Sequence, residues 1–416
     1  MSAVNKAIPT VLIAGAGAVG SVLALALARS GIAVTLVDKS VDAAHGNNMG
    51  SAPIEARPIA LSASSMRILD TLGVWRRIAP HACPIQMVHV GEQNCFGVVR
   101  LRASEHRLPA LGYVTDAAVI AAALVPAVAQ AEPITCLRGT QVLDGVVREN
   151  GIRVLFDDQD ADIDTGKEAQ LLVVADGGQS TLSSNLGIVS DHRDYQQLAV
   201  VCTVTPERAH QGTAYERFTL RGPLALLPMS GGDCALVWTL PDGEAQEVAG
   251  LGDADFIQAL RGAFGRRLGR FTATTARSVY PLIAARARSL HGVRAALIGN
   301  AANRLHPVAG QGLNLGLRDA ASLADLLAAA ARSAQDLGDD ALLAAYAQRR
   351  RAEHQGVVNF TGALAHGFSA GPAWLGAVRS TAMLALDLLP VGRHLLARHA
   401  MGLGRPQARL VRGLNP

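Results

Sequence analysis

A glycine-rich turn near the N-terminus has the residue types and spacing of a nucleotide-binding loop. It follows an apolar run at residues 11–14 and reads Gly15-Ala16-Gly17-Ala18-Val19-Gly20. Gly15 permits a tight turn out of a strand, Gly17 lets a pyrophosphate approach the backbone, and Gly20 lets the next helix pack closely against the sheet. The free N–H groups that open this helix favour phosphate binding.

Asp38 narrows the ligand that this loop predicts. It closes the second expected strand, residues 33–37, where a carboxylate about 20 residues after the loop accepts hydrogen bonds from ribose hydroxyls. Its charge disfavours a 2′-phosphate, so the pattern indicates NAD or FAD rather than NADP. The alternative interpretation is that the glycines serve only turns and packing.

Two later segments favour FAD. Asp176 and Gly177 follow an apolar strand at residues 169–174, although Asp-Gly is also a common turn. The second segment is far more distinctive. It comprises Gly299-Asn300-Ala301-Ala302 and then His306-Pro307-Val308-Ala309-Gly310-Gln311-Gly312-Leu313-Asn314-Leu315-Gly316-Leu317-Arg318-Asp319. Pro307 restricts the backbone, and Gly310 and Gly312 allow a flat isoalloxazine ring to lie against it. The N–H groups at the start of the helix from Leu313 can stabilise the negative charge of reduced flavin.

This run resembles the signature of the flavoprotein aromatic hydroxylases, H-P-x-[AG]-G-Q-G-x-N-x-G-x-x-D, and more narrowly their ubiquinone-biosynthesis branch. Residues 306–319 match every fixed position. The likeness extends over about residues 9–355. Further matching segments are Arg57-Pro58-Ile59-Ala60-Leu61-Ser62, Leu72-Gly73-Val74-Trp75, Glu216-Arg217-Phe218, Gly222-Pro223-Leu224-Ala225-Leu226-Leu227-Pro228-Met229 and Tyr280-Pro281-Leu282.

The resemblance implies an enzyme that hydroxylates the ring of a prenylated methoxyphenol. It implies bound FAD, NADH or NADPH as a transient reductant, and O2, which reacts at the flavin to give a C4a-hydroperoxide. Arg57 is expected to hold the flavin or gate its movement, and Gln311 with the backbone of Leu313 and Asn314 to contact its ring. His306, beside Pro307, is a candidate base, although a structural hydrogen bond is the alternative.

One position departs from the wider family. Gly299 is followed by Asn300 where most members have an aspartate that binds the flavin ribityl chain. Asparagine still forms hydrogen bonds but lacks the added strength of a carboxylate, a loss of about 1 kcal/mol. We interpret Asn300 as a feature of the branch that weakens FAD binding slightly.

The positions of these motifs predict an α/β fold, in which a glutathione-reductase-type, Rossmann-like FAD domain interleaves with a mainly antiparallel β-sheet domain. We expect the FAD domain to comprise residues 1–75, 98–185 and 280–350. Residues 76–97 and 186–279 then form the substrate-binding sheet, and residues 351–416 form C-terminal helices. In that sheet the apolar residues Leu226, Pro228, Met229 and Trp238 are candidates for the substrate pocket, with simple core packing as the alternative.

Composition excludes several other classes of protein. The net charge of +4 is small for a 416-residue chain, and no lysine-rich run suggests nucleic-acid binding. The five cysteines are widely spaced, without a CxxC pair, so neither a disulfide framework nor a metal site is expected. Glycines and Arg29 interrupt the apolar N-terminus, which predicts no membrane span. A cytoplasmic protein is expected.

The C-terminal segment is basic and apolar. Beyond residue 356 it has Asp387 as a single acid among several arginines. An amphipathic helix of this kind can contact an anionic bilayer, at the inner face of the membrane, or another enzyme of ubiquinone biosynthesis. The alternative is a helical cap on the flavin domain. For the chain as a whole, two other functions stay open, namely a hydroxylase of a small soluble phenol and a non-catalytic scaffold.

Overall fold

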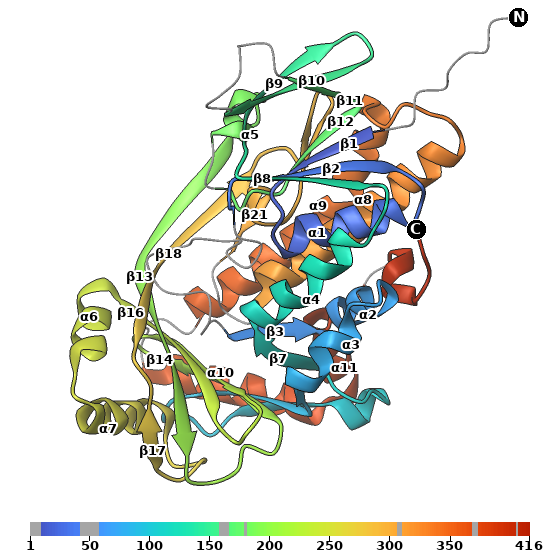
Figure 1. The fold of residues 1–416 in the computed structure, drawn as a ribbon. Coiled ribbons are helices and arrows are strands. Elements are labelled where there is room, and N and C mark those ends of the chain that lie inside the picture. Colours follow the sequence, from blue (N-terminus) through green and yellow to red (C-terminus); the bar gives the residue numbers. More distant parts are fainter. Residues whose placement is uncertain are drawn as a thin grey trace, which may run out of the picture.

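The structure, a computed structural model, describes residues 10–41, 58–157, 166–178, 181–305, 310–367, 373–404 and 407–416, without the side chains of 360–367 and 373–377. Figure 1 shows a mainly parallel sheet with helices at one end of the molecule and a second sheet at the other, joined by long strands. Arginine 57, His306 and Pro307 fall outside the described residues.

The mainly parallel sheet has the strand order β19-β20-β12-β1-β2-β8. Its strands β12 and β20 are buried along their whole length and β1 from Val11 onward, which fits a parallel sheet covered on both faces. The antiparallel partner at one edge is β19. The bounds are β1 (Thr10–Ala14), β2 (Ala33–Asp38), β8 (Ile134–Arg138), β12 (Leu171–Val174), β19 (His291–Gly292) and β20 (Ala295–Leu297).

Helices pack beside this sheet. They are α1 (Ala18–Ala28), α4 (Ala117–Ala129), α8 (Gln311–Arg332) and α9 (Asp340–Gly367). Helix α1 packs against α4 and α8, and α8 packs against α9. Residues 20–27 of α1 are all buried, because the sheet and the neighbouring helices leave this helix no solvated face.

The second sheet is larger and mainly antiparallel. Its order is β21-β18-β13-β16-β15-β14-β5-β6, with β17 also paired to β13. In Figure 1 the long strands β13 and β18 run from the parallel sheet to this one. The bounds are β5 (Met87–Glu92), β6 (Val98–Arg102), β13 (Ser190–Pro206), β14 (Thr213–Thr219), β15 (Gly222–Pro228), β16 (Cys234–Pro241), β17 (Phe271–Thr274), β18 (Ser278–Ala287) and β21 (Asn303–Arg304).

Helices α6 (Asp242–Gly250) and α7 (Asp253–Phe264) cover one face of this second sheet. Phe256, Leu260 and Phe264 of α7 form a buried cluster with side chains of β13, β15 and β16. This face is therefore a closed hydrophobic core.

The remaining strands form two small three-stranded sheets. One has the order β3-β7-β4 and the other β11-β10-β9. Their bounds are β3 (Pro58–Ser62), β4 (Cys83–Ile85), β7 (Gly112–Asp116), β9 (Gln141–Arg148), β10 (Gly151–Asp157) and β11 (Lys167–Ala169). Short helices are α2 (Ala63–Thr71), α3 (Trp75–Ile78) and α5 (Leu182–Asn185).

The C-terminal helices α10 (Ala373–Leu388) and α11 (Pro390–Ala400) pack against β6. Arg379 pairs with Glu92 at 2.5 Å, and Arg100 with Asp387 at 2.8 Å. The final 3-10 turn, Arg409–Arg412, instead contacts α2 and α8. The alternative of a cap on the flavin domain describes this last turn and the residues just after α11, where the carbonyl oxygen of Met401 accepts from the N–H of Ser64 at 3.2 Å, whereas α10 and α11 pack against the second sheet.

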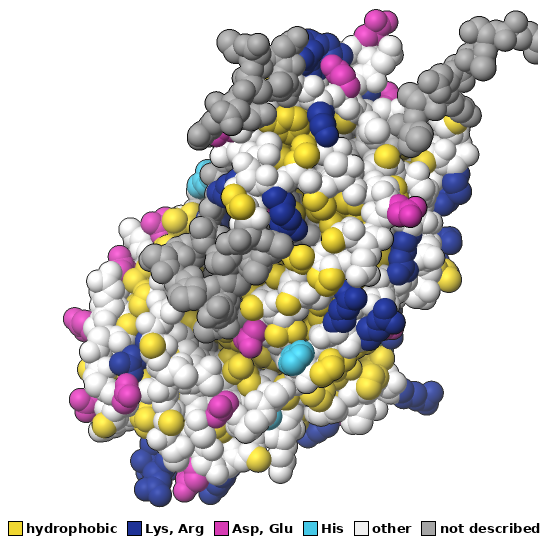
Figure 2. Space-filling view, in the orientation of Figure 1, with side chains coloured by type: hydrophobic (Ala, Val, Ile, Leu, Met, Phe, Trp, Pro, Cys, Tyr) yellow, Lys and Arg dark blue, Asp and Glu magenta, His cyan; other side chains and the backbone are white. Residues whose placement is uncertain are grey.

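The predicted fold class is confirmed, and the sheet pairings refine its subdivision. Strands β6 and β18 belong to the second sheet, although β6 and most of β18 fall in segments assigned to the FAD domain. Within the described residues, no helix has both the length and the hydropathy needed to cross a membrane. On the face shown in Figure 2, the described Lys and Arg side chains stand singly or in small groups rather than in one basic track.

Candidate active site

The glycine loop between β1 and α1 is shaped by close backbone contacts. Gly15 has φ +110°, and its N–H donates to the carbonyl oxygen of Val37 at 2.7 Å. A Cβ atom on Gly15 would overlap with Ala175, and one on Gly20 with the carbonyl oxygen of Gly15. The tight turn and the close packing predicted for these two glycines are therefore present.

The first turn of α1 has the features of an anion site. Gly17 is its N-cap residue and makes no side-chain capping hydrogen bond, and Ala18 and Val19 begin the helix. The first turn contains no acidic residue. A pyrophosphate fits here, because backbone N–H groups point outward at the positive end of the helix dipole.

Asp38 has a structural role that the sequence pattern did not indicate. Its Oδ2 accepts from the backbone N–H of Ala16 at 2.6 Å, and its Oδ1 from that of Ser40 at 2.8 Å. The carboxylate therefore fastens the glycine loop to the end of β2. Each carboxylate oxygen has a second lone pair, so the predicted ribose contact stays compatible with these bonds.

The segments at 176–178 and 299–301 meet beside this loop. Asp176 Oδ1 accepts from the N–H of Gly178 at 2.9 Å, and a Cβ on Gly178 would lie 2.7 Å from the carbonyl oxygen of Asn300. Gly177 and Gly299 have φ values of +84° and +63°. Because β1, β12 and β20 are parallel, their carboxyl ends bring these turns to one edge of the sheet, where such folds bind nucleotides.

The N-terminus of α8 closes the other side of the site. Gly310 is its N-cap with φ +58°, and Gln311, Gly312 and Leu313 form its first turn. No acidic residue lies in that turn, so its N–H groups provide a positive surface for a flavin ring. Asn300 Oδ1 lies 3.7 Å from the Cβ position of Gly312.

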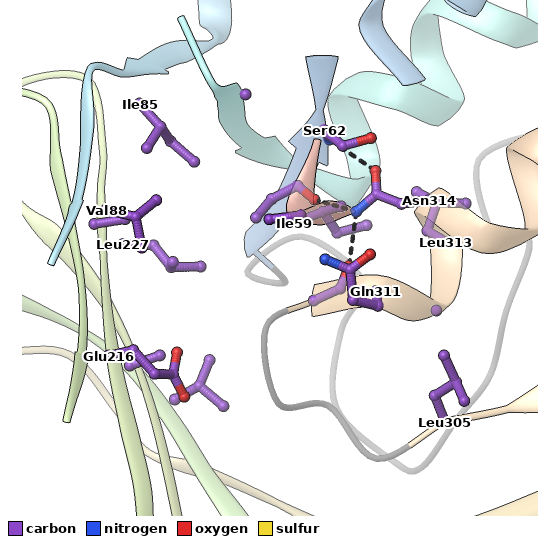
Figure 3. Close-up of a pocket in the computed structure, with 18 of the residues that line it drawn as sticks. Ile59, Ser62, Ile85, Val88, Glu216, Leu227, Leu305, Gln311, Leu313 and Asn314 are labelled. Carbon is purple, nitrogen blue, oxygen red and sulfur yellow. Dashed lines mark hydrogen bonds between the residues drawn. The ribbon is translucent and has the colours of Figure 1, made fainter. Parts of the chain in front are cut away.

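Asn314 connects α8 to strand β3. Its Oδ1 accepts from the N–H of Ser62 at 2.8 Å and from the hydroxyl of Ser65 at 2.7 Å. Its Nδ2 donates to the carbonyl oxygens of Ala60 and Gly310, both at 2.8 Å. Figure 3 shows this side chain turned toward β3. The backbone of Asn314 can still face a flavin, as predicted, while its side chain holds the wall of the site together.

A buried network of charged side chains connects α8 to α9. Asp319 is fully buried and accepts from Arg350 Nε at 2.7 Å and from His354 Nε2 at 2.8 Å. Burial opposes ionisation of Asp319, but the charges of His354 and Arg350 hold its pKa below the usual value. Asp319 Oδ2 also accepts from the N–H of Gly299 at 3.4 Å. This network links α9 to the turn that carries Asn300.

A cavity of about 560 Å³ lies between the start of α8 and the inner face of the second sheet. Figure 3 shows Gln311, Leu313 and Asn314 on one side of it and Val88, Glu216 and Leu227 on the other. Its lining is mostly apolar, and the C-terminal helices contribute to it. Their lining residues are Met383, Leu386, Leu396, Ala397, Ala400 and Met401.

Two of the four substrate residues predicted on the sheet face away from the cavity, and Met229 packs in the cluster on the cavity side without lining the cavity itself. Leu226 and Trp238 lie in the core under α6 and α7, and neither Pro228 nor Met229 is among the residues that line this cavity. The lining side chains of these strands are Ala225, Leu227 and Val237. Side chains alternate along a strand, so Leu226 and Leu227 face opposite sides of the sheet.

Glu216 is a cavity residue to which the sequence analysis gave no role. It lies in β14 and is half-buried, with its carboxyl group directed into the cavity. Burial raises the pKa of this carboxyl group to about 8. The signal in the sequence was a single acid in an otherwise apolar alternation, but the alternation alone does not reveal which face is the pocket.

The donor set fits FAD. The glycine loop and α1 can hold a pyrophosphate, Asp38 lies at a ribose position, and Gly310, Gly312 and Leu313 offer a flat backbone surface to a ring. Among the described residues, no group of His, Cys, Asp or Glu side chains is arranged to hold a metal ion. The positions predicted for Arg57, His306 and Pro307 lie outside the described residues and stay predictions.

Comparison with known proteins agrees with this geometry. A family model described as an FAD binding domain matches residues 9–361. The chain belongs to this FAD-binding family. It is 34% identical over 409 residues to the ubiquinone hydroxylase UbiL of Rhodospirillum rubrum, covering 97% of this chain and 92% of the relative. It is 30% identical over 396 residues to the 3-demethoxyubiquinol 3-hydroxylase of Escherichia coli, covering 94% and 98%.

The solved structures support the same fold. The p-nitrophenol 4-monooxygenase PnpA of Pseudomonas putida superposes with a TM-score of 0.74 at 15% identity, over 96% of this chain and 99% of that one. The family match and the hydroxylase relatives establish an FAD-dependent aromatic hydroxylase of the family to which the ubiquinone hydroxylases belong. The predicted family and the predicted class of enzyme are thus confirmed.

Proposed function

We propose that this hydroxylase acts in ubiquinone biosynthesis, on the aromatic ring of a prenylated methoxyphenol, with NADH or NADPH as reductant and O2 as the oxygen source. The observation that carries the proposal is the apolar cavity between the α8 N-terminus and the second sheet. A small soluble phenol needs apolar contacts only around its ring, whereas a prenyl tail needs an apolar surface that extends beyond the ring. The names of the relatives from Rhodospirillum rubrum and Escherichia coli support the same pathway.

When bound and reduced, FAD supplies the chemistry that transfers one oxygen atom from O2 to the ring. The residues of the chain bind and orient the cofactor and the substrate. The amides of α1 hold the pyrophosphate, Asp38 the ribose, Asn300 the ribityl chain, and the first turn of α8 faces the flavin ring. The glycine loop is taken by FAD, so the nicotinamide binds elsewhere and only transiently.

The cavity walls orient the substrate and exclude water. We place the ring near Gln311 and Leu313, which would face the flavin, and the prenyl tail along Met383, Leu386 and Leu396. Apolar burial favours the tail by about 0.8 kcal/mol for each buried CH2 group. Shielding from water strengthens every electrostatic contact with the ring.

The first test is the visible spectrum of the purified protein, followed by reconstitution with FAD. We expect about one flavin per chain, and NAD(P)H oxidation that a short-chain prenylated methoxyphenol stimulates. Mass spectrometry with isotopically labelled O2 should show one oxygen atom added to the ring. A protein that takes up no FAD supports the scaffold alternative, and equal turnover of the unprenylated phenol supports the small-phenol alternative.

Tail recognition can be tested separately with Met383→Gln, which places an amide in the apolar wall. The Met383 side chain lines the cavity and is 7% exposed. We expect KM for the prenylated phenol to rise about tenfold, because a buried amide without partners costs about 1–3 kcal/mol. Turnover of the unprenylated phenol should change little. An equal loss with both substrates contradicts this placement of the tail.

We further propose that the junction of α10 and α11 contacts an anionic bilayer, from which a prenylated substrate is drawn. Leu388, Leu389, Val391 and Leu395 are 61–74% exposed there, close in sequence to the lining residues Leu386 and Leu396. A basic segment that displays leucines suits an anionic lipid surface better than a neutral one.

Co-sedimentation with phosphatidylglycerol vesicles should detect this contact, and phosphatidylcholine vesicles should bind less protein. The double variant Leu389→Ser and Val391→Ser should lose binding. The matched control is Leu220→Ser, which changes a leucine that is 69% exposed on the loop between β14 and β15. Equal binding by all three proteins, or none by the wild type, contradicts the proposal.

A further inference from the structure

Glu216 is the one acid in a row of apolar side chains on the inner face of the second sheet. In register it pairs with Val90 of β5 on one side and with Ala225 of β15 on the other. The row continues from Ala225 to Val237 of β16. All four residues line the cavity.

The surroundings of Glu216 give it no structural task. Its neighbour Arg217 belongs to the opposite face, where its guanidinium group donates to the Glu92 carbonyl oxygen at 3.3 Å and lies 5.8 Å from the Phe264 ring. Within the described part of the chain, burial is the whole cause of the raised pKa of Glu216, without a contribution from a hydrogen bond or a charge. A half-buried acid that has no partner among the described residues and is shielded enough for its pKa to rise is a candidate for function.

The position of Glu216 suits a contact with substrate. Figure 3 shows its carboxyl group across the cavity from Gln311 and Leu313, at the start of α8. A flavin ring against α8 leaves the space between it and β14 for a flat aromatic substrate. A hydroxyl group on that substrate then finds Glu216 as the only carboxyl group among the described residues of the lining.

We propose that Glu216 is the acid–base residue that takes up and returns the proton of the phenolic hydroxyl. The ionised carboxylate accepts this proton, so the phenolic O–H bond breaks and the ring becomes an electron-rich phenolate. After one oxygen atom has been transferred, the ring carbon releases its hydrogen as a proton to water. Glu216 then returns its proton to the original oxygen, and both the ring and the carboxylate are restored.

This inference rests on the proposed phenolic substrate, but it goes further by assigning the base. A carboxyl group whose pKa is about 8 is a stronger base than an ordinary glutamate, and it stays largely protonated below that pH. Its basicity is therefore closer to that of a phenol, which favours proton transfer between them. Among the described residues, the other ionisable groups that line the cavity are Tyr215, Tyr280 and Arg304.

The central variant is Glu216→Gln, which keeps the size and hydrogen bonding of the side chain but cannot accept the proton. We expect kcat to fall about 100-fold or more, with KM and FAD content nearly unchanged. Wild-type kcat should rise between pH 6.5 and 9, and the profile of the variant should be flat over this range. Glu216→Asp should restore part of kcat and its pH dependence. Glu247→Gln, an exposed acid on α6, is the matched control.

A second readout does not need turnover. Infrared difference spectra of the FAD-bound protein, recorded without substrate, should show a protonated carboxylic acid that ionises near pH 8 and is absent from Glu216→Gln. Variants Tyr280→Phe and Arg304→Gln should shift this transition only slightly if Glu216 is its source. A transition that persists in Glu216→Gln contradicts the assignment.

The outcomes separate this inference from the proposed function. If the wild type hydroxylates the prenylated phenol and Glu216→Gln matches it in kcat and pH profile, then the role of Glu216 is wrong and the function stands. If the wild type binds FAD but hydroxylates no prenylated phenol, the proposed function fails. Unprenylated phenols then test Glu216 by the same comparison of wild type and variant.

Discussion

Replacing Asn314 by alanine should destabilise the protein through strand β3. In the described structure β3 lies at the edge of its sheet, so backbone groups that face away from β7 need other partners. The Asn314 side chain acts as an additional strand residue, because it accepts from Ser62 N–H and donates to the carbonyl oxygen of Ala60. Its Nδ2 also satisfies the carbonyl oxygen of Gly310.

The magnitude follows from the groups left without partners. Asn314 is 2% exposed, and Asn314→Ala removes the partner of three backbone groups, of which that of Ser62 is buried, that of Ala60 half-buried and that of Gly310 exposed. Each buried group without a partner costs about 1–3 kcal/mol. The hydroxyl of Ser65 has a second partner in Ser62 Oγ at 3.1 Å and adds little. The buried N–H of Ser62 contributes most of the cost, so we expect a loss of about 2 kcal/mol in the free energy of unfolding.

Urea unfolding of the protein without FAD measures this loss, and FAD titration measures its consequence for the site. The matched control is Asn303→Ala. Asn303 is also buried, at 3% exposure, but its Nδ2 has no hydrogen-bond partner among the described residues. We expect Asn303→Ala to cost clearly less than Asn314→Ala. Asn314→Asp should be at least as damaging as Asn314→Ala, since a carboxylate oxygen would then face two carbonyl oxygens.

One result would refute this reasoning. If Asn314→Ala unfolds like the wild type without FAD but binds FAD much more weakly, the side chain serves the flavin directly. The bridge to β3 would then carry little energy. A loss of stability in both states, with the FAD affinity lowered only in proportion, supports the bridge.

Two further predictions concern the flavin and acid stability. Asn300→Asp should lower the dissociation constant of FAD about fivefold, because a carboxylate forms stronger hydrogen bonds with ribityl hydroxyls and lies near the positive end of α8. Fluorescence titration of the apoprotein with FAD measures this constant. Unchanged or weaker FAD binding contradicts the prediction. Burial, with the charges of Arg267 and Arg217, lowers the pKa of His89 to about 4. Below pH 6.5 the unfolded chain therefore binds more protons than the folded one, so stability is lost as the pH falls from 6.5 toward 4. Between pH 7 and pH 5, His89→Leu should lose less stability against urea than the wild type. The matched control is His192→Gln, which changes an exposed histidine and should lose as much as the wild type. Equal losses in all three proteins contradict the assignment of this pH dependence to His89.

The sequence by itself was sufficient for the elements with local signals. The glycine loop, the acid at the end of β2 and the glycines around residue 310 each depend on short-range geometry. Gly15 and Gly310 adopt positive φ, which few residue types tolerate. Continuous apolar runs such as β1 and β12 indicate a parallel sheet covered on both faces. These patterns sufficed to predict the α/β fold and FAD binding, and the resemblance of residues 306–319 to a known signature predicted the family.

The tertiary structure alone decided which face of the second sheet meets the cavity. Strands β15 and β16 are apolar on both faces, because α6 and α7 cover one face and the cavity lies against the other. The hydrophobic pattern therefore cannot distinguish Leu226 from Leu227, and two of the predicted residues, Leu226 and Trp238, lie on the core face. Glu216 became a candidate catalytic residue only once its row of side chains was known to line the cavity. The role of the Asn314 side chain became clear only once β3 was known to be an edge strand. Each of these assignments depends on pairings between distant segments, which local sequence does not encode.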